Sequence, residues 1–364
     1  MASLWNNRIS FSIFGESHGP AIGVVIDNLP PGEYIRTEEI AAFLARRAPK
    51  KNKTSTPRSE KDMPQIMSGV CNNRTTGTPL CAFIQNTDTH SADYNNVRSL
   101  ARPGHADYTG AQRYQGFNDV RGGGHFSGRL TAPLVFAGAV CAQILERRGI
   151  YTGAHISEIH SIKDKAFDEI KVSRDDIVAL RKKDFPVIDD AAGEKMTADI
   201  VKAHDALDSV GGIIECASVN VPCGIGSPIF DGLENTISQL VFGIPAVKGI
   251  EFGAGFMASK MLGSQNNDEF YVDDHGHVLT KTNHHGGILG GISSGMPVIF
   301  RVAIKPTPSI SRPQHTIDYK QMMNDVINIK GRHDPCIVPR AVPCVEAAAN
   351  IALLNHILDY PNFR

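Results

Sequence analysis

The chain of 364 residues has almost no net charge and no long apolar run. It contains 37 basic and 38 acidic residues, so its formal net charge is −1 at pH 7, which argues against a general binder of nucleic acid or other polyanions. No run of residues is both long enough and apolar enough to cross a bilayer. Residues 1–5 lack the basic and apolar regions of a signal peptide. We therefore expect a cytoplasmic protein with no nucleic-acid partner and no membrane segment.

Cysteine is sparse as well. The seven cysteines lie apart without a CxxC pair, and their odd number fits reduced thiols better than a disulfide framework. No zinc site is indicated, and we expect no metal. Hydrophobic residues make up 41% of the chain and charged residues 21%, which is typical of a soluble globular protein with a sizeable core. Length alone allows one large domain or two ordinary ones.

Glycine is abundant, and it gathers beside basic residues in segment 102–129. Three successive glycines at 122–124 remove every Cβ from a short stretch, so a ligand can come close to its backbone N–H groups. The apolar segment 130–147 that follows is predicted to be a buried helix, and a glycine loop at a helix start is a natural anion site. A tight turn is the alternative for the glycines alone. The neighbouring arginines and histidines favour an anion or cofactor site.

Two further segments combine glycine with histidine: residues 15–19, which contain His18, and residues 284–291. For His18 the alternative is a turn histidine bonded to backbone. Residues 46–58 form the densest basic segment of the chain. This segment is either a solvated charge run or a mobile loop that closes over a multiply anionic ligand.

The hydrophobic pattern predicts a mixture of strands and helices. Strands are expected at 9–14, 21–26, 66–70, 79–84, 152–159, 210–221, 247–252 and 298–304. Helices are expected at 38–46, 175–181, 196–207, 233–242 and 341–358. Two small-residue segments with few charges, 132–145 and 343–354, favour a helical core covered by sheets. No GxGxxG follows a strand, so a Rossmann unit is not predicted.

Three basic segments, 46–58, 102–129 and 305–332, accompany the three segments of glycine and histidine. A site assembled from all of them would be strongly positive and lined by backbone donors. It would suit a ligand with a phosphate and carboxylates, and a phosphorylated cofactor. Histidines change charge near neutral pH and are suited to acid–base catalysis. The residues alone therefore indicate an anion-binding enzyme, without identifying its reaction.

Six segments resemble the signature segments of the chorismate synthase family and occur in that family's order. They are GESHG at 15–19, RPGHAD at 102–107, RGGG at 121–124, GSQN at 263–266, GGILGGISSG at 286–295 and GRHDPC at 331–336. The resemblance covers the chain from end to end. It implies a single domain over residues 1–364, in the α+β/α/β layered sandwich class. In this class central helices lie between antiparallel β-sheets, with pseudo-duplicated halves, and the family assembles as a homotetramer.

The resemblance also implies a reaction. 5-Enolpyruvylshikimate 3-phosphate would lose phosphate and its C6 proton by 1,4-anti-elimination to give chorismate, the last step of the shikimate pathway. Such a carbon–oxygen lyase requires reduced FMN without net redox change, and NADPH would serve only to reduce the flavin. Two alternatives stay open: an NAD(P)H-dependent flavin reductase and a non-catalytic protein that binds phosphorylated metabolites.

The family's functional residues match positions of this chain. His18 would act as the acid near the leaving phosphate, His105 would offset charge at the flavin pyrimidine edge, and Asp334 would lie near flavin N5 and help the ring receive the C6 proton. The residues implied to bind substrate or NADP are Arg47, Lys53, Arg102 and Arg129. The residues implied to bind FMN are His125, Phe126, Ser127, Ala246, Gly290, Lys305, Pro306, Thr307, Pro308, Ser309 and Arg332.

Two segments and one single residue depart from the family pattern. Many members read RSSAR where this chain has HFSGR at 125–129, and KPTSS where it has KPTPS at 305–309. Lys53 stands where many members have arginine, and it loses the bidentate fork of a guanidinium. These departures affect the individual contacts of His125, Phe126 and Pro308 more than the implied reaction.

Overall fold

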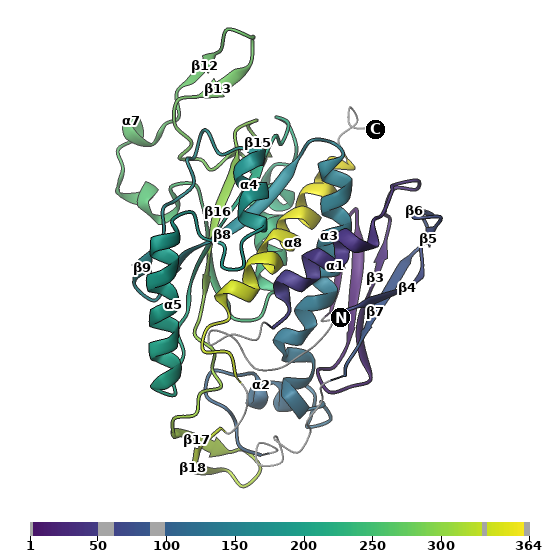
Figure 1. Ribbon diagram of the computed structural model, residues 1–364, viewed down its shortest axis with the longest axis vertical. Coiled ribbons are helices and arrows are strands. Elements are labelled where there is room, and N and C mark those ends of the chain that lie inside the picture. The colour runs from purple at the N-terminus through teal and green to yellow at the C-terminus, as the bar shows by residue number, and fades with distance from the viewer. Residues whose placement is uncertain (1–2, 50–61, 88–98, 330–332, 360–364) are drawn as a thin grey trace.

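The computed structural model describes residues 3–49, 62–87, 99–329 and 333–359 (Figure 1). It contains both helices and sheets, which confirms the mixed α and β class. One antiparallel sheet has the strand order β1 (Leu4–Asn6), β2 (Ser10–Gly15), β3 (Ala21–Asp27), β7 (Leu80–Gln85) and β4 (Pro64–Ser68). A second antiparallel sheet has the order β11 (Val247–Phe252), β16 (Val298–Ile304), β10 (Gly212–Val219), β8 (Tyr151–Ile159) and β9 (Ile162–Lys163).

The described residues also form four separate two-stranded hairpins. They are β5 (Val70–Cys71) with β6 (Arg74–Thr75), β12 (Phe270–Val272) with β13 (Val278–Thr280), β14 (Ile288–Leu289) with β15 (Ile292–Ser293), and β17 (Gln314–Asp318) with β18 (Met323–Ile327). The α-helices are α1 (Thr37–Arg47), α2 (Asp107–Arg113), α3 (Thr131–Glu146), α4 (Arg174–Arg181), α5 (Asp190–Asp205), α6 (Leu233–Phe242), α7 (Gly263–Asn266) and α8 (Val338–Ile357). Short 3₁₀ turns are η2 (Arg121–Phe126), η3 (Gly128–Leu130), η4 (Ile229–Asp231) and η5 (Gly255–Lys260).

The two small-residue helices, α3 and α8, pack against each other in the core (Figure 1). Nearly every residue of both is buried, as the sequence predicts. At their crossing a Cβ on Gly138 would lie 2.2 Å from Cβ of Ala347, so only glycine permits this approach. Helix α3 contacts β3 and β7 of the first sheet, while α8 contacts β8 and β10 of the second. The core helices therefore join the two sheets.

Several boundaries differ from the sequence prediction for local reasons. The N-cap of α1 is Arg36, so the helix begins at Thr37, one residue before the predicted start at 38. Helix α5 begins at Asp190, well before the predicted residue 196, because the side chain of Asp189 accepts a hydrogen bond from the Ala191 N–H. Within the predicted strand 210–221, β10 has a register shift between Ile213 and Ile214, just after the glycine pair at 211–212.

The sequence analysis expected no segment long and apolar enough to cross a bilayer, and one helical stretch contradicts this expectation by its length and composition. The stretch Gly128–Glu146 is long and apolar enough, but 94% of its apolar window is buried inside the protein. Core helices share this property with membrane spans, and the burial identifies this one as a core helix.

Part of the basic segment predicted to be a mobile loop is helical. Arg46 and Arg47 form the last turn of α1, where Arg46 Nη1 lies 2.5 Å from Glu346 Oε2. Residues 50–61, including Lys53, lie outside the described residues. The predicted loop is therefore shorter than 46–58 at its start.

Candidate active site

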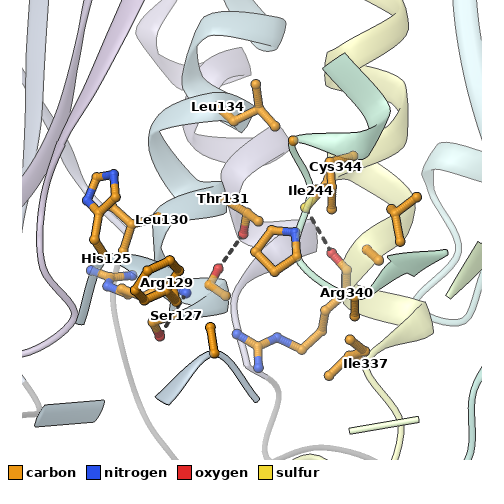
Figure 2. Close-up of a pocket in the computed structure, with 18 of the residues that line it drawn as sticks. His125, Ser127, Arg129, Leu130, Thr131, Leu134, Ile244, Ile337, Arg340 and Cys344 are labelled. Atoms are coloured by element: carbon orange, nitrogen blue, oxygen red, sulfur yellow. Dashed lines mark hydrogen bonds between the residues drawn. The ribbon is translucent and has the colours of Figure 1, made fainter. Parts of the chain in front are cut away.

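A cavity of about 840 Å³ opens at the N-terminal ends of α3 and α8. Its volume falls in the range of small-molecule sites, roughly 300–1,000 Å³. Its lining comes from separate parts of the chain, among them residues 3–5, 47–49, 102–106, 122–131, 242–247, 305–309 and 333–341. Figure 2 shows one side of the cavity formed by His125, Ser127 and Arg129 and the other by Ile337, Arg340 and Cys344.

The triple-glycine segment lies against two histidines. Gly122, Gly123 and Gly124 have φ values of 60°, 86° and 55°, a region that residues with a Cβ rarely adopt. A Cβ on Gly122 would lie 2.0 Å from Nδ1 of His18, and one on Gly123 would lie 3.1 Å from Nε2 of His105. The glycines therefore allow both rings to pack on one loop, although the rings are 87 positions apart in the sequence.

His105 is oriented by a buried carboxylate. Asp107 Oδ1 lies 2.8 Å from His105 Nδ1, and both Asp107 oxygens accept hydrogen bonds of 2.7 Å from Arg102. Burial acts to raise the pKa of Asp107, but the hydrogen bonds from Arg102 and His105 outweigh it and hold this pKa well below its usual range. With Nδ1 facing the carboxylate, Nε2 of His105 faces the glycine loop.

Two cavity arginines, Arg47 and Arg129, share a second buried carboxylate, Asp62. Burial acts to raise the pKa of Asp62, but the charges and hydrogen bonds of both arginines lower it below its usual value. Two guanidinium groups beside the cavity thus share this one carboxylate. This is the electrostatic character predicted for an anion site.

Asp334 lies at the opposite wall with Arg340, a residue that the sequence analysis did not select. Arg340 Nη1 donates to Asp334 Oδ2 at 2.5 Å, and its Nε donates to the Arg47 carbonyl at 2.9 Å. Arg340 thus joins Asp334 to the end of α1. Burial raises the pKa of the nearby Cys336 thiol to about 12, so this cysteine is not a nucleophile at neutral pH.

The predicted flavin-binding residues come together on two walls. His125 Nδ1 donates to the Gly15 carbonyl at 2.7 Å, and its Nε2 lies 2.5 Å from Ser3 Oγ. Lys305 donates to the Gly104 carbonyl through Nζ, and burial together with nearby Lys248 lowers its pKa.

The hydroxyl oxygen of Thr307, on the same wall as Lys305, is a further polar group. It is buried and has no hydrogen-bond partner within the described part of the chain. Buried polar groups normally have a partner, so this hydroxyl is available to a ligand.

Most predicted site residues line the cavity directly. They are Arg47, Arg102, His105, His125, Phe126, Ser127, Arg129, Ala246, Lys305, Thr307, Pro308, Ser309 and Asp334. Gly122 lines the cavity, but His18 does not, and the His18 ring lies behind Gly122. Pro306 and Gly290 do not line it either, and Gly290 is exposed in the turn of the β14–β15 hairpin, where its φ of 62° accounts for the glycine. Lys53 and Arg332 lie outside the described residues.

The sequence analysis missed the side chains that hold the cavity residues in place. Asp62, Asn86 and Arg340 were not selected, and Asp107 was noted without a role. The available signal for Asp62 was its position shortly after the basic segment 46–58. The contacts of Asn86 with Arg129 and of Arg340 with Arg47 join residues far apart in the sequence.

Comparisons with known proteins agree over almost the whole chain. The family model described as chorismate synthase matches residues 9–358. The chorismate synthase of Thermococcus kodakarensis is 45% identical over 350 residues, covering 96% of both chains. That of Dehalococcoides mccartyi is 47% identical over 355 residues, covering 98% of this chain and 96% of the relative. A crystal structure of chorismate synthase matches with a TM-score of 0.74 at 27% identity, covering 98% of this chain and 93% of the other.

Proposed function

The chain belongs to the chorismate synthase family, and we propose that its cavity converts 5-enolpyruvylshikimate 3-phosphate into chorismate and inorganic phosphate. The reaction breaks the C–O bond to phosphate and removes the C6 proton, and a new C=C bond forms. This 1,4-anti-elimination makes the protein a carbon–oxygen lyase at the last step of the shikimate pathway, in aromatic amino acid biosynthesis.

One observation carries this proposal: two histidines pack on successive glycines beside a cavity lined by arginines. The arginines suit a substrate with a phosphate and carboxylates. A histidine can supply a proton to a leaving phosphate, which is a poor leaving group without one. We assign this role to His18, whose ring packs against the cavity residue Gly122.

The residues present also fit FMN. His105, Ser127, Lys305 and the partnerless hydroxyl of Thr307 supply donors on the walls of one cavity, and Phe126 supplies an apolar face. The remaining expected FMN contacts are His125, Ala246, Gly290, Pro306, Pro308, Ser309 and Arg332. When bound, reduced FMN would supply electron density to the reacting substrate without net redox change. NADPH would serve only to reduce the flavin.

The side chains have separate tasks in this proposal. Arg47, Arg102 and Arg129 hold the anionic groups, with Lys53 as a further expected contact. Asp107 holds the His105 ring at the glycine loop, where its charge offsets that of the reduced cofactor. Asp334 lies on the opposite wall, held by Arg340, and assists removal of the C6 proton.

We further infer the family's assembly and location. The packing of α3 and α8 supports central helices between two sheets, and the presence of one sheet with one core helix in each half supports pseudo-duplicated halves. Phe230, Phe256 and Phe270 are 89%, 81% and 60% exposed in the single chain. Exposed aromatic groups of this kind favour burial between subunits, which supports a homotetramer. The cytoplasm is the expected location.

The decisive experiment is turnover under anaerobic conditions with fully reduced FMN. We expect equimolar release of inorganic phosphate and chorismate, and absence of both would reject the proposal. Oxidation of NADPH with oxidised FMN, without chorismate formation, would instead indicate a flavin reductase. Ligand binding without turnover in any flavin state would indicate a non-catalytic binding protein.

A further inference from the structure

Asp62 occupies a central position between two arginines of the cavity. Its Oδ2 accepts from Nε of Arg47 at 3.1 Å and from Nη2 of the same residue, while its Oδ1 accepts from Nη1 of Arg129. The side chains of Asp62, Arg47 and Arg129 are only 1%, 2% and 5% exposed. Each carboxylate oxygen is therefore committed to a different guanidinium.

Asn86 extends this arrangement to the segment that carries His18. Its Oδ1 accepts from Nε of Arg129 at 3.0 Å. Its Nδ2 donates to the carbonyls of Glu16 at 3.0 Å and Gly19 at 2.9 Å, on either side of His18. One amide thus fixes both an anion-binding arginine and the histidine loop.

Asp62 could either compete with an incoming anion for the two arginines or hold these arginines in place, and its burial decides between the two roles. A carboxylate that competed with the ligand would need to leave its arginines when the ligand arrived. The Asp62 side chain is buried. If it moved away from the arginines, its carboxylate would become an unpaired charge in the protein interior, which is strongly unfavourable. It does not line the cavity, whereas both arginines do. Asp62 therefore supports the arginines from behind.

We propose that Asp62 and Asn86 are positioning residues that hold Arg47, Arg129 and the His18 loop as one unit, so that a bound phosphate is presented to His18. The part that concerns His18 rests on the proposed lyase function. The part that concerns the arginines requires only that the cavity binds an anion.

The two residues can be separated by substitution. Asp62→Asn keeps one oxygen that can accept from one guanidinium group, and it turns an NH₂ group toward the other guanidinium group. Because fixed cations hold substrate and transition state alike, we expect KM to rise on the order of 10- to 100-fold with kcat nearly unchanged. Asn86→Asp keeps the acceptor for Arg129 but loses both donations to the His18 loop. We therefore expect kcat to fall about 10²-fold, together with a rise in KM because the new carboxylate lies beside Arg129.

Glu33 offers a matched control. It also bridges two arginines with one oxygen each, Arg147 at 2.6 Å and Arg148 at 2.7 Å, and none of these residues lines the cavity. Glu33→Gln removes the same charge from the same kind of cluster. Its KM and kcat should match those of the unsubstituted protein.

Binding of inorganic phosphate provides a readout that does not depend on catalysis. Phosphate should raise the melting temperature of the unsubstituted protein and of Glu33→Gln. Its Kd should rise about 10- to 100-fold in Asp62→Asn. Asn86→Asp also places a carboxylate beside Arg129, so its phosphate Kd should rise as well, while its kcat at saturating substrate remains a test if Asp62→Asn fails to fold.

The outcomes separate the two proposals. If the unsubstituted protein forms no chorismate, the lyase function fails, and phosphate binding still tests Asp62. If it forms chorismate but Asp62→Asn matches Glu33→Gln in both KM and phosphate Kd, the positioning role of Asp62 is wrong. Equal kcat values for Asn86→Asp and the unsubstituted protein would remove the role of Asn86.

Discussion

Replacing Gly122 by alanine tests the packing of His18 on the glycine loop. The added Cβ would lie 2.0 Å from His18 Nδ1, while ordinary contact begins at 3.4 Å, so the ring would have to move by about 1.4 Å. A misplacement of about 1 Å in a catalytic group can lower the rate roughly 10²-fold. We therefore expect Gly122→Ala to reduce turnover by about two orders of magnitude at saturating ligands.

The substitution also forces alanine into a left-handed backbone conformation, and this effect must be separated from the clash. Gly149 provides the control, because its φ of 80° is also left-handed and a Cβ there meets nothing within 4 Å. Both substitutions should lose about 1–2 kcal/mol of stability from the backbone. Gly149→Ala should keep full turnover.

The assay is anaerobic chorismate formation with reduced FMN, together with urea unfolding of each variant. Comparison of the two alanine variants at equal fractions of folded protein isolates the movement of His18. If Gly122→Ala turns over as fast as Gly149→Ala, the position of His18 on this loop has no part in catalysis. A loss of turnover in both variants would instead identify backbone strain as the cause.

Three further predictions concern ionisable groups. His105→Ala should lose less turnover when FMN is supplied already reduced than when it is reduced during the assay, as parallel initial rates would show. Asp334→Ala should still bind substrate and flavin in equilibrium titrations, with turnover reduced about 10²–10⁴-fold. Burial acts to lower the pKa of His155. The hydrogen bonds and charges of Asp164 and Glu215 outweigh burial, so the pKa is raised. The stability from this protonated ring is complete below the unfolded pKa of about 6.5 and is lost as pH rises through the folded pKa. The free energy of unfolding, measured in urea at several pH values from 6 to 9, should therefore decline less with rising pH in His155→Gln than in the unsubstituted protein.

Much of the secondary structure could be predicted because the signals are local. The boundaries of α6, β11 and β16 match the sequence prediction residue for residue. In each case an apolar pattern fills the element and turn residues lie near its ends. The start of α5 was missed because one side chain, Asp189, begins the helix in a stretch with little apolar pattern.

The site was predictable in residue type but not in arrangement. Glycine, histidine and arginine mark the chemistry, and most of the predicted residues line one cavity. The acids that hold them could not be found by pattern, since Asp62 pairs with Arg129 across 67 positions of sequence. At Gly290 the turn conformation by itself accounts for the glycine, and the flavin contact stays a prediction.

The departure from the family pattern at His125 bears on where the positive charge of the cavity comes from. A carbonyl oxygen can only accept, so Nδ1 of His125 carries the hydrogen that it donates to Gly15. Nε2 of the same ring lies 2.5 Å from Ser3 Oγ, so both ring nitrogens have partners within the protein. Where many relatives have a fixed cation, this chain uses the ring to join its first strand region to the segment that carries His18. The charge that holds anionic ligands must therefore rest more heavily on Arg47, Arg102 and Arg129, whose alignment depends on buried carboxylates.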